Sequence, residues 1–350
     1  MRTRLLAVLV LVTSMALAQQ RLAWYPIIGS SPETSLILGA GGYYTLKKAD
    51  SATRTSFLNG NAMGTLRKQW MVGLSSNYFT KGEKYYIDAD ISYVGFPLYF
   101  YGIGNEVSRV EREIYHSNTF RFQFLAYRSL VKKLFLGVGY RAGNVHRMEY
   151  KEGGILETLQ PLGVNGHYYS GLQAALLFDS RDNQLGASRG WYLRISRSLF
   201  HPSLGSRYHF SGQSIDLRKY FKPFKKREDV LALQAFAQGT TGDVPFTELA
   251  LLGSGNLMRG YYSGQYRDRY YWATQAEYRY KLNSWLGFAG FVGMGSVAAS
   301  ADGFRADEVK PNYGVGARIA IMPSGNLTLR IDYGRGNESG NLYIAIMEAF

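Results

Sequence analysis

Hydrophobic and polar residues alternate with a period of two along much of the chain. The clearest run consists of Leu327, Leu329, Ile331 and Tyr333, which alternate with Thr328, Arg330 and Asp332. Similar runs lie around residues 85–91, 276–280, 315–321 and 342–347. This period is that of a β-strand, and each run has about the 9–11 residues that a tilted strand needs to cross a bilayer. At the end of the chain, the same phase predicts a strand that continues to Phe350.

The two faces of these predicted strands differ in chemistry. One face is apolar, whereas the other carries full charges, as Arg330 and Asp332 show. A soluble barrel turns its apolar side chains inward, so a charged face opposite an apolar one favours a wet lumen and an exterior in lipid. A soluble two-sheet sandwich also alternates, but it does not need strands of such uniform length or so many aromatic residues near strand ends. The pattern therefore predicts a membrane barrel.

The spacing of the runs sets the number of strands. At about 20 residues per strand and connection, the chain has room for roughly 16 strands, the least distinct lying near Leu22–Ile28 and Arg54–Gly64. Short connections such as Asn283–Trp285 alternate with longer loops, namely Gly95–Arg112, His146–His167, Thr240–Arg269 and Ala298–Asn312. With an even number of strands, short turns and both termini are periplasmic and long loops lie outside. We therefore expect an all-β fold, a 16-stranded antiparallel transmembrane β-barrel.

The N-terminus has the layout of a secretory signal peptide. Arg2 and Arg4 precede an apolar stretch, and Ala16-Leu17-Ala18 supplies a small-residue cleavage site. Residues 1–18 are therefore expected to be the signal peptide and residues 19–350 the barrel. The first strand pattern begins within about fifteen residues of the cleavage site, so no periplasmic domain is expected ahead of the barrel. This layout predicts the bacterial outer membrane as the location.

Composition narrows the chemistry. The chain has no cysteine, five histidines, 40 glycines, 28 tyrosines and a formal net charge of +14. The absence of cysteine excludes a disulfide framework, a thiolate metal site and a cysteine nucleophile. Glycine and tyrosine are both enriched in antiparallel membrane barrels, where glycine marks bends and tyrosine forms interface girdles. Because the phosphate-loop, dinucleotide, zinc-protease and calcium-loop motifs are absent, we expect no cofactor and no metal.

An enzymatic alternative rests on His209 and Ser211, which lie two residues apart on one predicted strand face. Outer-membrane lipid hydrolases use such a pair, with the histidine activating the serine hydroxyl. A third group must orient the histidine, and Asp216 and Asn183 are the candidates. Since this spacing also arises by chance in a serine-containing β protein, we expect that the chain is not an enzyme.

The segment Leu217–Arg227 holds six basic residues and three aromatic residues around a predicted periplasmic turn. Basic clusters with aromatic residues occur at nucleic-acid interfaces. In a barrel, however, aromatic residues lie at the membrane interface and lysine and arginine contact lipid phosphates. The expected partners are therefore outer-membrane lipids and lipopolysaccharide, and not nucleic acid.

The longest predicted outer loop contains an unusually apolar stretch, Leu249–Gly253, followed by Arg259. A loop of this composition can fold back into the barrel, where a guanidinium needs an acidic partner. Glu277 and Asp332 lie on the charged phase of nearby strands and are the candidate lumen partners. The alternative is an arginine exposed on the loop surface.

The segment around Arg259, Gly260 and Tyr261, with Gly264 and Arg267-Asp268 after it, resembles the signature of the bacterial surface antigen family. This is the outer-membrane barrel superfamily that includes BamA, TamA and FhaC. Supporting matches are Pro32–Thr34, Tyr101–Asn105, a periplasmic turn with Asp179, Arg181, Asp182, Asn183 and Gly190, the pair of segments Gly314–Arg318 and Arg330–Gly334, and a terminal aromatic residue, Phe350. The resemblance covers essentially the whole mature chain.

The resemblance implies roles for several of these residues. In the family, the arginine matched by Arg259 lies inside the barrel and pairs with an acidic residue of an inner strand. The usual aspartate is replaced here by Gly293, so we expect Glu277 or Asp332 to take its place. The proline of the mid-barrel turn is also missing, with Ala187 near its position. Phe350 would belong to the C-terminal assembly signal.

The resemblance further implies a scaffold or channel in protein insertion, translocation or outer-membrane assembly, with a weak seam between the first and last strands. Because no POTRA domain is expected, a partner protein would replace its function. The alternative is a passive pore with a basic, anion-favouring lumen, and a lipid hydrolase is third.

Overall fold

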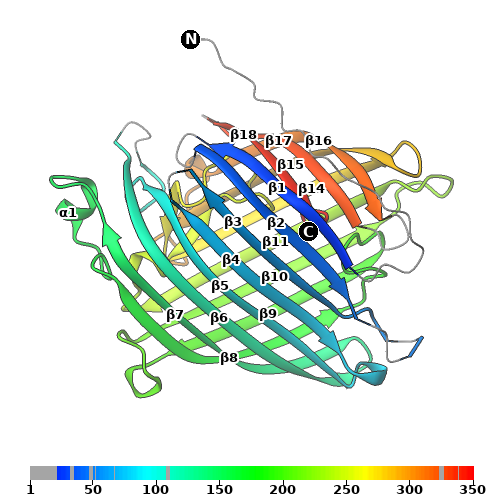
Figure 1. Cartoon of the computed structure of the whole chain (residues 1–350), viewed down its shortest axis with the longest axis horizontal. Helices are drawn as coiled ribbons and strands as arrows, with labels where there is room; N and C mark the ends of the chain where they lie inside the picture. Colours follow the sequence, from blue (N-terminus) through cyan, green and yellow to red (C-terminus); the bar gives the residue numbers. More distant parts are fainter. Residues whose placement is uncertain are drawn as a thin grey trace, which may run out of the picture.

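The computed structural model describes residues 22–31, 35–46, 50–51, 53–66, 68–107, 111–322, 327–337 and 339–350. The predicted signal peptide, residues 1–18, and the segment 32–34 lie outside these ranges. Within them, sixteen antiparallel strands form one sheet in which each strand pairs with the next along the chain, and β12 and β13 form a separate pair. The strands are steeply tilted and curve into a barrel (Figure 1).

The strands are β1 (Leu22–Ser31), β2 (Ser35–Thr45), β3 (Phe57–Thr65), β4 (Trp70–Phe79), β5 (Tyr85–Phe100), β6 (Glu113–Val131), β7 (Leu134–Glu149), β8 (His167–Asp179), β9 (Gly190–Phe200), β10 (Phe210–Phe221), β11 (Val230–Gly242), β12 (Ala250–Leu252), β13 (Tyr266–Asp268), β14 (Tyr270–Lys281), β15 (Leu286–Ala298), β16 (Lys310–Met322), β17 (Leu327–Arg335) and β18 (Gly340–Ile346). The helices are α1 (Ile155–Leu159) and the short 3-10 segments η1 (Lys81–Glu83), η2 (Pro202–Leu204), η3 (Phe246–Glu248) and η4 (Ala306–Glu308). In the described ranges no helix has both the length and the apolar character required to cross a membrane.

The two faces of the sheet differ as the alternation predicts. Val138, Val292 and Val315 point outward and are 66%, 59% and 65% exposed, whereas Glu277 and Asp332 point inward and have no exposed surface. Apolar side chains therefore cover the exterior and charged side chains lie in the lumen, as in barrels that span membranes. The predicted all-β, 16-stranded antiparallel transmembrane barrel is confirmed.

The connections divide the barrel into two ends. Loop residues 101–107, 111–112, 150–166, 243–269 and 299–309 lie at one end, here called the long-loop end. Turns 80–84, 132–133, 222–229 and 282–285 lie at the other, the short-turn end. Several strands are longer than the 9–11 residues expected: β6 has 19, and β5 and β7 each have 16. The loops predicted from Gly95 and His146 therefore begin too early, because the hydrogen-bonded ladder of β5 and β6 continues to Phe100 opposite Glu113.

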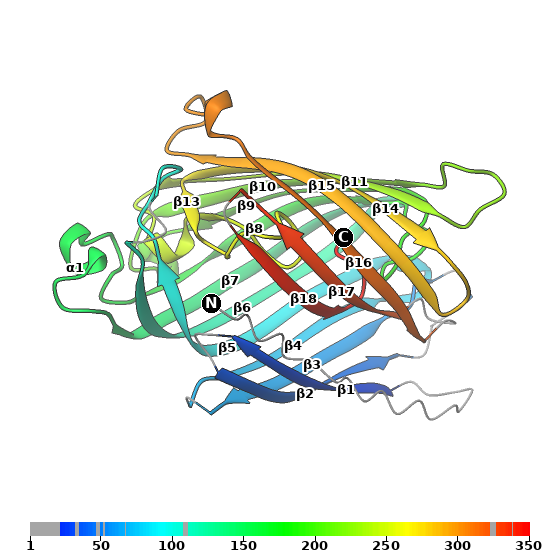
Figure 2. The same ribbon diagram turned by 90° about the horizontal axis from the view of Figure 1, so that it is seen from above.

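The first and last strands lie on the same side of the molecule (Figure 2). For the described residues, β1 pairs with β2 and β18 with β17, and no ladder joins β1 to β18. Across this seam, the hydroxyl of Tyr43 lies 3.2 Å from the Sδ atom of Met347.

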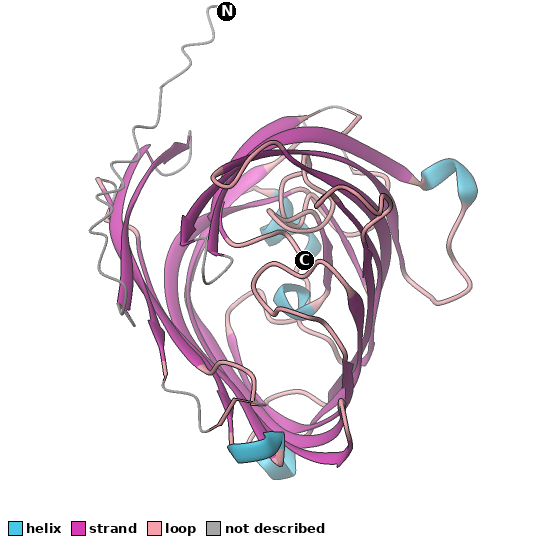
Figure 3. Cartoon of the chain, turned by 90° about the vertical axis from the view of Figure 1, so that its right-hand side faces the viewer, coloured by secondary structure: helices cyan, strands magenta, loops and turns pink. Residues whose placement is uncertain are grey.

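The C-terminal residues leave the barrel wall. The alternation predicted a strand through Phe350, but β18 ends at Ile346, and Met347 has a φ of +78° that turns the backbone away. Figure 3 shows the C-terminus inside the ring of strands. There Phe350 and Ala349 are buried in a cluster with Ala187, Tyr220 and Ala232. The predicted strand through Phe350 is therefore wrong. Apolar residues at the C-terminus fit burial in the lumen as well as they fit the outer face of a strand.

The turn between β8 and β9 is organised by two polar side chains. Oδ1 of Asp182 accepts hydrogen bonds from the backbone amides of Asn183, Ser188 and Arg189 at 2.9–3.1 Å. Oδ1 of Asn183 accepts two further backbone amides, at 2.7 and 3.1 Å. Burial alone raises the pKa of Asp182, but the hydrogen bonds from the Ser188 hydroxyl and these amides hold it below its usual range.

The same turn is fixed to the barrel wall at both ends. The Asp179 carboxylate pairs with Nε of Arg181 at 2.9 Å and with Nη1 of Arg54 at 2.8 Å. Arg54 was predicted within a strand but precedes β3, where it also pairs with Glu83. Gly190 has a φ of +110°, and a Cβ atom there would lie 2.4 Å from the carbonyl oxygen of Ser180. Glycine is therefore the residue that this turn accommodates.

We expect Gly190→Ala to lower the free energy of unfolding by about 1–3 kcal/mol, because it adds backbone strain and a steric clash. Gly290→Ala is the matched control, since a Cβ atom at Gly290 meets nothing within 4 Å. Urea unfolding of the barrel in lipid vesicles, followed by tryptophan fluorescence, measures both. Equal unfolding midpoints for the two variants would contradict the account of this turn.

Candidate functional site

The loop between β11 and β14, residues 243–269, folds back into the barrel and is here called the inward loop. Its strands β12 and β13 pair with each other, and Figure 2 shows β13 within the outline of the barrel. The loop and the inner wall share one apolar cluster, which comprises Ala250, Leu252, Met258, Tyr261 and Tyr266 of the loop and Tyr271, Ala273 and Val297 of the wall. This packing accounts for the apolar stretch that the sequence places in a loop.

Arg259, in the inward loop, has no exposed surface. Nη2 of its guanidinium lies 2.7 Å from Oε2 of Glu277, and Nη1 lies 2.5 Å from Oδ2 of Asp332. The guanidinium also lies 3.4 Å from the ring centroid of Phe291, where a cation–π attraction adds to the ion pairs. The sequence predicted Glu277 or Asp332 as the partner of Arg259, and the structure pairs Arg259 with both. Arg259 is therefore not exposed on the loop surface.

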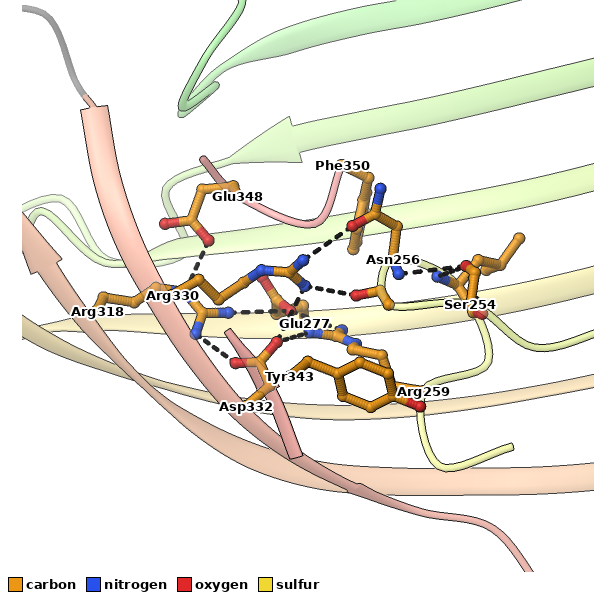
Figure 4. A network of polar contacts seen from close by, with 12 residues as sticks. Ser254, Asn256, Arg259, Glu277, Arg318, Arg330, Asp332, Tyr343, Glu348 and Phe350 are labelled. Carbon is orange, nitrogen blue, oxygen red and sulfur yellow. Dashed lines mark hydrogen bonds and ion pairs between the residues drawn. The ribbon is translucent and has the colours of Figure 1, made fainter. Parts of the chain in front are cut away.

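The two carboxylates bind further arginines of the inner wall (Figure 4). Glu277 also pairs with Arg279 at 2.7 Å and with Arg318 at 3.4 Å. Asp332 also pairs with Arg318 at 2.5 Å and with Arg330 at 3.1 Å. Each charge therefore has several opposite charges around it, which a buried ion needs to offset its lost hydration.

This network continues in both directions. Towards the inward loop, Nη1 of Arg330 donates to the carbonyl of Gly255 and Nη2 donates to Oδ1 of Asn256, both at 2.8 Å. Towards the C-terminus, Glu348 pairs with Arg318 at 2.7 Å, and Nη2 of Arg279 donates to the backbone oxygen of Phe350 at 3.0 Å. We name the network of Arg259, Glu277, Arg279, Arg318, Arg330, Asp332 and Glu348 the lumen network.

Sequence reasoning included Arg318 and Arg330 in the family-like segments but gave no site role to them, to Arg279 or to Glu348. The first three lie on the charged phase of β14, β16 and β17, and that phase is the signal that could have found them. Their meeting depends on the register, which pairs Gly316 with Asp332 and Arg318 with Arg330. The sequence does not reveal this register.

The tip of the inward loop contacts the last strands through its backbone. The amide of Gly260 donates to the hydroxyl of Tyr343 at 2.9 Å, and its carbonyl accepts from Nδ2 of Asn341 at 3.0 Å. Gly260 has a φ of +111°, and a Cβ atom there would lie 2.5 Å from the carbonyl carbon of Arg335. Only glycine fits so close to β17, which explains its place beside Arg259.

Tyr261 completes this contact. Its hydroxyl donates to the carbonyl of Pro311 at 2.7 Å and accepts from the amide of Asn337 at 3.1 Å. A Cβ atom at Gly336 would lie 2.5 Å from the Tyr261 ring. Arg259, Gly260 and Tyr261 therefore bind the inner face of β14–β18, next to the seam.

Comparison with known proteins gives the family. A model of the Omp85 superfamily domain matches residues 44–341. The chain belongs to the Omp85 superfamily. The family resemblance that the sequence motifs indicated is thereby confirmed. A search of the curated proteins found no match.

Solved structures share the fold of this Omp85 chain. BamA from Haemophilus ducreyi lacking POTRA domains 1–3 has a TM-score of 0.58 at 14% identity, covering 94% of this chain and 70% of that one. CdiB from Acinetobacter baumannii has a TM-score of 0.58 at 12% identity, covering 94% and 60%. CdiB from Escherichia coli has a TM-score of 0.57 at 12% identity, covering 95% and 63%. The chain therefore spans between 60% and 70% of the length of these proteins.

Gly293 marks a departure from the expected Omp85 pattern that the structure explains. Gly293 lies opposite Asn312 in the ladder of β15 and β16, and a Cβ atom at Gly293 would lie 2.6 Å from Oδ1 of Asn312. Nδ2 of Asn312 donates to the carbonyl of Arg259 at 2.9 Å. An amide side chain thus fills the space beside this position and binds the backbone of the inward loop, while the acidic partners come from β14 and β17.

The residues of the enzymatic alternative have other partners. The hydroxyl of Ser211 lies 2.8 Å from that of Thr241 on the neighbouring strand. The ring of His209 stacks edge-on against that of His201, with centroids 4.9 Å apart. Asp216 pairs with Arg218. Among the described residues, no group of three or more histidine, aspartate or glutamate side chains could hold a metal ion.

We expect Arg259→Ala to release the inward loop, because it leaves Glu277 and Asp332 without their loop partner and breaks a buried ion pair at a cost of about 3–5 kcal/mol. The protein has no cysteine, so Leu252→Cys, at a buried loop position, provides a unique thiol. Its rate of reaction with a bulky maleimide reports exposure of the loop. The rate should rise at least ~10-fold in the Arg259→Ala background.

Two further variants make this measurement specific. Arg305→Ala removes an arginine whose side chain is 63% exposed, and it should leave the rate unchanged. Arg259→Lys should give an intermediate rate, because an ammonium cannot present the two-sided fork that spans Glu277 and Asp332. A rate that is equal in all backgrounds would show that the guanidinium does not hold the loop.

Proposed function

We propose that this chain is a bacterial outer-membrane barrel that serves as a scaffold or channel in protein insertion, translocation or outer-membrane assembly. The observation that carries the proposal is the complete burial of Arg259 between Glu277 and Asp332. This arrangement places a structured loop on the inner wall beside the seam, where a client chain would meet the barrel.

The seam supports the proposal. In the described residues, β1 and β18 share no ladder, and a side-chain contact joins Tyr43 of β2 to Met347, which follows β18. An unpaired strand edge is a template for another strand, and its backbone groups can pair with those of an incoming chain. The inward loop binds β18 through Tyr343, so the loop and one edge of the seam are physically connected.

A partner protein is the second part of the proposal. Beyond the barrel and its loops, the described residues form no separate domain that could receive a client. We infer that a partner protein supplies this function and that membrane lipids and lipopolysaccharide surround the barrel.

A passive pore is the second candidate function, and a basic hollow in the lumen favours it. This hollow, of about 320 Å³, lies at the short-turn end, and its charged lining comprises Arg54, Arg181 and Arg194 with Asp88 and Asp179. The aspartates pair with these arginines, so the hollow has a small excess of positive charge, which favours anions.

Affinity purification from native outer membranes after brief chemical cross-linking tests the proposed function. We expect a partner protein in stoichiometric amount with the natural chain, and at least ~5-fold less of it with Arg259→Ala, because the released loop disturbs the seam. Arg305→Ala, the surface control, should retain the partner.

Planar-bilayer conductance separates the two candidates. A scaffold with a bound inward loop should give small and irregular currents that increase in Arg259→Ala. A stable anion-selective channel that is unchanged by this substitution, together with a lone barrel after purification, would establish the passive pore instead.

A further inference from the structure

The turn between β10 and β11, residues 222–229, forms a basic and aromatic surface that the lumen network does not involve. Figure 2 shows this turn projecting from the end of the barrel opposite α1. The basic residues of the turn and the adjoining strand ends are Arg189, Lys219, Lys222, Lys225, Lys226 and Arg227. We call this surface the basic rim.

A hollow of about 460 Å³ lies within the basic rim. Its charged lining comprises Arg189, Lys219, Lys222, Lys225 and Glu228. Nζ of Lys222 pairs with the Glu228 carboxylate, so these two charges offset each other. In the described part of the chain, no carboxylate pairs with Arg189, Lys219 or Lys225. The hollow therefore has an excess of positive charge that an anion can satisfy.

The hollow borders the apolar exterior of the barrel. Nζ of Lys219 lies 4.2 Å from the ring centroid of Trp191, which is its direct partner in the ladder of β9 and β10. Trp191 points outward in the same phase as Ile195, whose ladder partner on β10 is Ile215, and these three side chains are 44%, 42% and 47% exposed. Phe224 in the turn is 51% exposed. Tryptophan and lysine in this arrangement are typical of the level of lipid headgroups.

We propose that the basic rim binds the phosphodiester of an anionic phospholipid in the leaflet at the short-turn end. The phosphate would occupy the hollow between Arg189, Lys219 and Lys225, and the acyl chains would lie along Trp191, Ile195 and Ile215. An isolated phosphate ion or an acidic protein segment would use the charges but not this apolar track. The inference rests on the proposed membrane placement and is independent of any client or partner protein.

Native mass spectrometry of the full chain tests this proposal. The detergent-solubilised protein is offered phosphatidylglycerol or phosphatidylcholine with identical acyl chains, and inorganic phosphate is added as a third probe. We expect phosphatidylglycerol to be retained at least ~10-fold more strongly than phosphatidylcholine, and this preference to weaken with salt. Millimolar inorganic phosphate should not displace the lipid.

Two triple variants with the same loss of charge locate the binding. Arg189→Gln/Lys219→Gln/Lys225→Gln removes the three unpaired cations of the hollow and should lower retention of phosphatidylglycerol about 10-fold. Lys81→Gln/Lys84→Gln/Lys132→Gln removes exposed cations of the same end, none of them in the basic rim, and should retain the lipid. Circular dichroism and heat-modifiable mobility verify that both variants fold.

Each other outcome overturns the proposal in a distinct way. Equal loss in the two variants would mean that net charge alone attracts the lipid. Displacement by inorganic phosphate would reveal a site for a free anion. Failure to retain either lipid would contradict the proposed lipid site, whereas a missing partner protein would leave this result unaffected.

Discussion

The rest of the structure depends on a guanidinium that has been removed from water, that of Arg259. Burial of an unpaired ion costs several kcal/mol. The inward loop can therefore occupy the lumen only if carboxylate side chains of the inner wall pair with its arginine. Glu277 and Asp332 supply them from β14 and β17, which are separated by two strands. The register of this part of the wall and the position of the loop are therefore mutually dependent.

The two strands at the seam differ in their contacts with the lumen network and the inward loop. On one side, β18 is bound to the loop tip through Tyr343, and the chain after it enters the lumen, where Arg279 binds the backbone oxygen of Phe350. On the other side, β1 lies outside this network in the described residues. The proposed opening of the seam would therefore separate β1 from β18, which contacts the inward loop.

The sequence was sufficient for the fold class and for three residues that meet at the site, Arg259, Glu277 and Asp332, but not for the other residues of the lumen network. A period of two with one charged phase defines a membrane barrel, because lipid and water on opposite faces impose it. The ends of the strands were harder to predict, because the ladder of β5 and β6 continues beyond Gly95 without a change in the sequence pattern. The pairing of Arg318 and Arg330 with Asp332 depends on register, and the inward course of Phe350 depends on a backbone turn at Met347. Neither leaves a local signal.

A double-mutant cycle between Arg259 and Asp332 tests the central claim most directly. The free energy of unfolding is measured for the natural chain, Arg259→Met, Asp332→Asn and the double variant. If the buried ion pair holds the inward loop on the wall, the coupling energy should be about 2 kcal/mol or more, against about 0.5 kcal/mol or less for the exposed pair Arg305 and Asp307. Additive losses for Arg259 and Asp332, with a coupling energy of zero, would contradict the account.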